Sequence, residues 1–178
     1  MGKLSLKQSL FLGFCAVFIL LTRAGLRLHL GISGHVMFFT ILFLLTARGC
    51  VHYAFAATFT SLLAGMGAMA LGIGQGGPLL LTKFILPGLV IDIGAFMLPG
   101  MFKSYLQCVP VAAAASATKA ISTLIIDLLV GMDKTVIVQH ALLETAAAVF
   151  FGVAGSLFVP QIIRRLEAHG IIQSEKIK

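Results

Sequence analysis

Charged residues are scarce in this sequence. They make up 11% of its 178 residues, whereas hydrophobic residues make up 59%, and soluble globular domains carry about 25% charged residues. A water-soluble fold of this length could not bury so much apolar surface. The composition therefore excludes a soluble domain and leaves room for one membrane-embedded bundle and little else.

Tryptophan is absent and cysteine is rare. The three cysteines, Cys15, Cys50 and Cys108, share no spacing typical of metal sites, and their odd number and scatter argue against a disulfide framework. The formal net charge is +7, but no basic run with interleaved aromatic residues occurs, so the sequence indicates no nucleic-acid binding. We expect the cysteines to serve as small apolar packing residues.

Six apolar stretches fill almost the whole chain, and each is roughly long enough to cross a bilayer core of about 30 Å as a helix. The predicted fold is all-α: a polytopic membrane protein whose residues 1–178 form a single transmembrane domain with six transmembrane helices. We interpret the first apolar run as a retained helix rather than a cleaved signal peptide. The predicted helices cover residues 8–28, 31–47, 54–73, 79–99, 105–130 and 136–161, followed by a short cytoplasmic tail at 162–178.

Basic residues gather at one set of predicted helix ends. Only Arg27 and Lys134 clearly fall on the other side, so the positive-inside rule predicts that both termini are cytoplasmic. The basic residues on the predicted cytoplasmic side are Lys3, Lys7, Arg48, Lys103, Arg164, Arg165, Lys176 and Lys178.

Small residues recur every four positions on three of the predicted helices. Such a stripe lets helices approach closely in lipid, and we expect these stripes to pack inside the bundle. A shorter stripe on the first helix, Gly13 and Ala16, is the one that we expect to face a partner. The longer stripes are Ala64, Ala68, Gly72 and Gly76; Ala112, Ser116 and Ala120; and Ala148, Gly152 and Ser156.

Ionisable residues lie inside the apolar stretches, where an uncompensated charge costs several kcal/mol. Counting about 1.5 Å of rise per residue places most of them in the outer half of the membrane or near its midplane, and leaves only Asp92 deeper. His140 and Glu144 are four residues apart and share one helix face. The candidate substrate-binding residues, with one from the loop above them, are His35, Gln75, Lys83, Lys119, Asp127, His140 and Glu144.

Two interpretations of these residues stay open. They could form internal ion pairs, for example Lys83 with Glu144 and Lys119 with Asp127, that hold helices together. They could instead line an outward-open, water-accessible cavity that binds a small polar solute. The two interpretations are compatible, because a binding site usually orients its own charges by pairing.

Metal and catalytic chemistry receive little support. His35, Asp127, His140 and Glu144 are acceptable metal ligands, but no HxH or HxxxH pair occurs, and two nearby lysines would oppose a cation. No motif of an intramembrane protease is present either. We therefore predict no enzymatic activity, no metal site and no cofactor.

The span count, the chain length and the short glycine- and proline-rich loops resemble the substrate-specific S component of energy-coupling factor (ECF) transporters. The glycine-rich segment 74–78 and the run that ends in Leu86-Pro87-Gly88 look like pieces of such proteins, whereas the family's small-residue stripe on the first helix is represented here only by Gly13 and Ala16. The resemblance implies a subunit of the prokaryotic inner membrane that captures a vitamin or other micronutrient. It also implies a coupling transmembrane subunit, which Gly13 and Ala16 would contact, and two ATPase subunits.

The residues add one expectation about the solute. Lys83 and Lys119 favour an anionic or carbonyl-bearing group, held by charge-assisted hydrogen bonds. Two alternatives to this function stay open. A membrane scaffold of the MreD type would not require ionisable groups that converge in the outer half, and a transition-metal-uptake subunit would use the same histidines and carboxylates as ligands.

Overall fold

The structure, a computed structural model, describes residues 4–29, 34–51, 53–73, 79–98, 100–131 and 134–169. This part of the chain forms helices and contains no strand, which confirms the predicted all-α class. The elements are α1 (Leu6–His29), α2 (His35–Cys50), α3 (Ala56–Ala70), α4 (Leu80–Met97), the short 3₁₀ helix η2 (Met101–Lys103), α5 (Tyr105–Val130), α6 (Lys134–Ser156) and α7 (Val159–Ala168).

Four stretches of helix are long and apolar enough to cross a membrane. Among the described residues they cover Leu6–Gly25, Leu80–Met97, Tyr105–Leu129 and Ile137–Ala168. The helices α2 and α3 are apolar but contain only 16 and 15 residues, which gives about 23 Å of helix against a bilayer core of about 30 Å. A helix is therefore present in each of the six predicted regions. In four of these regions the helix is long enough to span a membrane.

The predicted sixth helix is broken near its end. α6 ends at Ser156 and α7 begins at Val159, with a turn between them. Pro160 has no N–H to donate to the carbonyl of Ser156, which would be its partner in a continuous helix. The thiol of Cys108 on α5 lies 3.8 Å from that carbonyl oxygen and takes the donor's place.

Residues 162–168 of the predicted tail are helical and belong to α7. The sequence predicts that the chain leaves the membrane at Arg164 and Arg165. In the structure, Val159 and Ile163 on the opposite face of α7 are buried, so the helix packs on the bundle with one side and exposes both arginines on the other.

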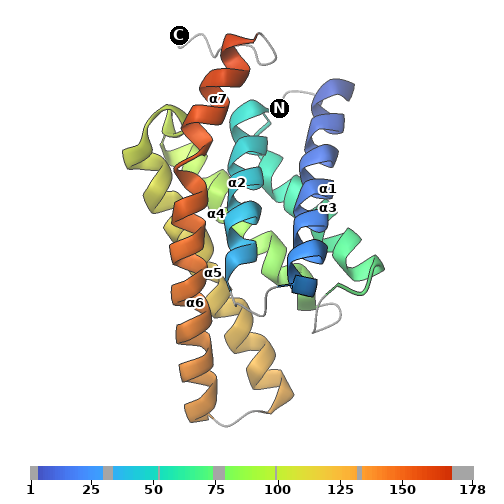
Figure 1. Cartoon of the computed structure of the whole chain (residues 1–178), viewed down its shortest axis with the longest axis vertical. Coiled ribbons are helices and arrows are strands. Elements are labelled where there is room, and N and C mark those ends of the chain that lie inside the picture. The colour runs from blue at the N-terminus through green and yellow to red at the C-terminus, as the bar shows by residue number, and fades with distance from the viewer. Residues whose placement is uncertain are drawn as a thin grey trace.

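Figure 1 shows α1, α2 and α6 lying close to the long axis of the molecule, while α3 and α4 cross it obliquely. α1 begins, α2 ends and α7 ends at one end of the molecule, at the top of the view, which we call the α7 end. At the opposite end, which we call the hairpin end, the α5–α6 hairpin extends beyond α1, α2 and α4 (Figure 1). Lys7, Arg48 and Arg165 are near the helix ends that meet at the α7 end.

Small residues allow the helices to approach closely inside the bundle. Ala112 and Ser116 on α5 and Ala148 on α6 are fully buried, and a Cβ added at Gly152 would collide with the Ser116 hydroxyl. A Cβ at Gly155 would lie 2.5 Å from the carbonyl oxygen of Phe38 on α2. These contacts confirm that the stripes on α5 and α6 serve internal packing.

Two glycines lie where the sequence predicts turns between helices. Gly100 precedes η2 with a φ of +92°, and Gly131 caps α5 with a φ of +78°. Both values lie in the left-handed region, which residues with a Cβ rarely adopt. The hairpin that carries most of the ionisable residues therefore turns at the predicted position.

Candidate functional site

The α5–α6 hairpin carries a row of ionisable side chains. The Lys119 ammonium on α5 lies 3.3 Å from Oε2 of Glu144 on α6, and these side chains are 19% and 23% exposed. The Thr123 hydroxyl, one turn further along α5, donates to the same carboxylate oxygen at 3.4 Å. Glu144 is therefore held to α5 by one charged and one neutral donor.

Closer to the hairpin turn, an imidazole lies between two carboxylates. Nδ1 of His140 is 3.2 Å from Oδ2 of Asp127, a buried residue of α5. Nε2 of the same ring is 3.8 Å from Oε1 of Glu144, one turn along α6. Lys119, Glu144, His140 and Asp127 thus form a continuous series of charged contacts, which we call the hairpin relay.

Two further cations come from α4 and α1. Lys83, in the first turn of α4, is close enough to the relay for coulombic interaction with Glu144, Asp127 and Lys119. It also interacts with Arg23 of α1, whose guanidinium carbon lies 4.3 Å from the centre of the Phe84 ring. Arg23 and Lys83 together with the hairpin relay are called the polar cluster below.

The sequence analysis missed Arg23. Its signal is the one that identified the others, namely a charged residue inside an apolar stretch with Leu20, Leu21 and Gly25 around it. Its guanidinium lies over the face of the Phe84 ring, and that cation–π contact favours a cation away from bulk water. Four helices, α1, α4, α5 and α6, therefore contribute charge to this region.

One predicted ion pair is wrong. Lys119 contacts Glu144 and not Asp127, which forms its contact with His140 instead. The reason is geometric: Asp127 lies about two turns beyond Lys119 on the same helix α5. In the antiparallel hairpin, Lys119 and Glu144 lie at similar distances from the turn, whereas Asp127 and His140 lie nearer to it.

The remaining predicted site residues divide into three cases. His35 is the first residue of α2, and its neighbour Gly34 packs against Ala147 of α6, so the start of α2 lies at the level of α6 just after Glu144. Gln75 lies outside the described residues. Of the two predicted partner contacts, a Cβ added at Gly13 would meet no atom within 4 Å, whereas Ala16 is 4% exposed and belongs to the internal core.

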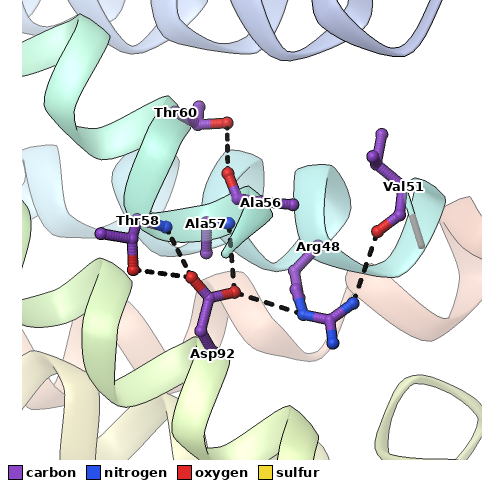
Figure 2. Close-up of polar contacts among 7 residues, drawn as sticks. All are labelled: Arg48, Val51, Ala56, Ala57, Thr58, Thr60 and Asp92. Carbon is purple, nitrogen blue, oxygen red and sulfur yellow. Dashed lines mark hydrogen bonds and ion pairs between the residues drawn. The ribbon is translucent and has the colours of Figure 1, made fainter. Parts of the chain in front are cut away.

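A second charged pair lies away from the polar cluster and joins three helices (Figure 2). Oδ1 of Asp92 on α4 is 3.2 Å from Nε of Arg48 on α2. The same carboxylate accepts hydrogen bonds from the backbone N–H groups of Ala57 and Thr58, at 3.2 and 2.7 Å, and from the Thr58 hydroxyl at 2.7 Å. Asp92 therefore caps the N-terminus of α3 from another helix.

This arrangement assigns Asp92 a structural role. The carboxylate is 3% exposed, its oxygens accept hydrogen bonds from α3, and it forms an ion pair with Arg48 of α2. A carboxylate at a helix N-terminus also interacts favourably with the helix dipole. The sequence placed Asp92 apart from the other ionisable residues, and the structure agrees with that separation.

Within the described residues, no group of three or more His, Cys, Asp or Glu side chains is placed to hold a metal ion. No protein-family model matches this chain, and no significant similarity to a curated protein or to a solved structure is found.

Proposed function

We propose that this chain is the solute-binding membrane subunit of an ECF-type importer and that it captures a small anionic micronutrient at the polar cluster. The observation that carries the proposal is the convergence of charges of both signs from α1, α4, α5 and α6, all apolar helices. Ionisable groups at membrane depth are costly, and they commonly mark the path or site of a solute or ion.

The balance of charge supports an anionic solute. The polar cluster contains three basic side chains, Arg23, Lys83 and Lys119, and two carboxylates, Asp127 and Glu144. With His140 neutral, one positive charge is in excess. A carboxylate or phosphate group on the solute would neutralise it and would form charge-assisted hydrogen bonds, which are about twice as strong as neutral ones.

In this proposal the relay orients the binding groups rather than competing with the solute. Glu144 holds the Lys119 ammonium from one side at 3.3 Å, and an ammonium has three donors. The remaining donors of Lys119 can reach a solute while the pair with Glu144 is kept. Fixing the cation in advance lowers the ordering cost of binding.

The proposed coupling surface lies on α1. Its exposed residues Leu10, Phe14, Val17 and Leu21 follow the helical period and form one apolar face. Gly13 lies beside that face with open space around it. In the importer, this face would contact the coupling transmembrane subunit, which with two ATPase subunits would supply the energy for uptake.

The test begins with the identity of the solute. Small molecules released from purified protein by denaturation are identified by mass spectrometry, and the identified anion is titrated into the wild type by calorimetry. Loss of a hydrogen bond to a charged group costs about 1.5–3 kcal/mol. We therefore expect Lys119→Met and Glu144→Gln each to weaken binding by roughly ten- to a hundredfold.

Lys7→Met and Glu167→Gln are matched controls, because they make the same chemical changes near the α7 end. Both should bind as the wild type does. Unchanged affinity in the Lys119 and Glu144 variants, on protein that stays monodisperse, would remove the polar cluster from the site. If no solute is released from any preparation, the scaffold alternative is favoured instead.

A further inference from the structure

His140 has carboxylate oxygens at both of its ring nitrogens. Asp127 approaches Nδ1 from α5 at 3.2 Å, and Glu144 approaches Nε2 from α6 at 3.8 Å. The imidazole side chain is 49% exposed at the surface of the hairpin. Among the described residues, the other titratable or charged groups near this triad include Lys119 on α5, Lys83 on α4 and His35 at the start of α2, the helix that packs on α6.

The two protonation states of the ring fit this environment unequally. A neutral imidazole has one N–H donor and one lone pair, whereas an ionised carboxylate only accepts hydrogen bonds. One of the two carboxylates must then face the ring's lone pair, which is repulsive. A doubly protonated imidazolium donates to both carboxylates and adds a positive charge between two negative ones.

The contacts also show which interaction is the weaker. The Asp127 contact is within hydrogen-bond distance, and the Glu144 contact is longer. Oε2 of Glu144 already accepts from Lys119 and Thr123. On loss of a proton the ring loses its charge, so the His140–Asp127 contact between α6 and α5 loses its charge assistance, and the attraction between Nε2 and Glu144 within α6 disappears.

We propose that His140 is a proton-binding switch that ties the outer parts of α5 and α6 together when protonated and loosens them when neutral. The inference deepens the proposed function, since it assigns the relay a regulatory role at the same site. The protonated ring adds a positive charge beside Lys119 and so favours capture of an anion. The neutral ring leaves the negative charge of Glu144 uncompensated on that side and favours release.

The experiment uses the full chain in lipid nanodiscs without any solute. Thermal unfolding is measured at about pH 5.5 and about pH 8, on either side of the range in which histidine changes charge. A partly exposed ion pair contributes at most about 1 kcal/mol, or about 2–4 °C for a chain of this size. Lowering the pH should therefore raise the melting temperature of the wild type by about 2–4 °C more than it raises that of His140→Gln.

His169→Gln is the matched control. His169 is exposed near the α7 end, and its Nδ1 lies 2.7 Å from the carbonyl oxygen of Arg165. This variant should keep the pH response of the wild type, whereas Asp127→Asn, which leaves His140 in place, should reduce it. Equal pH responses in His140→Gln and the wild type would overturn the switch.

A distance measurement tests the movement itself. Nitroxide labels at Leu128→Cys on α5 and Val138→Cys on α6, both more than half exposed, report the separation of the helices in a background whose three cysteines are replaced by alanine. The distance distribution should be narrow at low pH and broader at high pH, and the pH dependence should vanish with His140→Gln. A distribution that does not change with pH contradicts the proposal. Because no solute is present in either experiment, a negative result in the thermal or the distance measurement would contradict the switch alone. The solute-binding role is tested separately by calorimetry.

Discussion

Replacing Asp92 with Asn tests the network that joins α2, α3 and α4. The substitution keeps the size of the side chain but exchanges one acceptor oxygen for an NH₂ donor. Asp92 has acceptor contacts with Ala57 N–H, Thr58 N–H and the Thr58 hydroxyl. At least one of these donors would therefore face another donor, and the Arg48 guanidinium would lose its counter-charge.

The magnitude follows from burial. Breaking a buried ion pair by removing one partner costs about 3–5 kcal/mol, because the remaining charge stays in a low-dielectric environment. Arg48 is 16% exposed, so water compensates part of the loss and we expect the lower limit, about 3 kcal/mol. For a chain of this size, that corresponds to a fall in melting temperature of about 6–12 °C.

Thermal unfolding in nanodiscs provides the assay, with Glu167→Gln as the control for loss of one carboxylate near the α7 end. The double variant Arg48→Met, Asp92→Asn should be more stable than Asp92→Asn alone, because it leaves no unpaired charge. A melting temperature for Asp92→Asn within about 1 °C of the wild type would refute this assignment. A double variant that loses the full sum of both single effects would show that the two residues are not coupled.

Three further outcomes are expected. The Gly13→Phe variant should fold and bind solute but impair uptake by the complete importer. The Gly152→Phe variant should instead lower the melting temperature by several degrees, because overpacking costs about 1–3 kcal/mol. Equal effects of the two substitutions would place Gly13 inside the bundle. Exchanging the charges in Lys119→Glu, Glu144→Lys should recover most of the stability lost in either single variant, and no recovery in unfolding experiments would argue against the pair. A topology reporter fused after Lys178 should be active only in the cytoplasm, and a reporter inserted at Asp133 should be active only outside. If both reporters are active on the same side, the predicted six-span topology is contradicted.

The sequence was informative where local rules decide the structure. The bounds of α5 match the prediction because Ser104 precedes a long apolar run and Gly131 ends it in the left-handed conformation. The sequence prediction missed the break before α7, because the apolar pattern continues on both sides of Pro160. The proline itself indicates a helix boundary at this position. The long apolar helices could be predicted because uninterrupted apolar runs are visible in the sequence itself.

The candidate site was only partly predictable. The depth of each residue along its predicted helix placed Lys83, Lys119, His140 and Glu144 in one region. Which of them form pairs depends on the register of α5 against α6. That register is set by packing such as Gly152 against Ser116, which no residue count supplies. The cap that Asp92 forms on α3 could not be predicted either, because it joins residues 34 and 35 positions apart.

Native mass spectrometry tests the central claim, that the polar cluster holds a small anionic solute, most directly. We predict that the wild type, released from membranes of its own cells, carries one additional mass corresponding to a small anion. The Lys7→Met variant should keep this mass, and the double variant Lys83→Met, Lys119→Met should lose it while remaining folded. An additional mass that persists in the double variant, or that is absent from the wild type, would contradict the account.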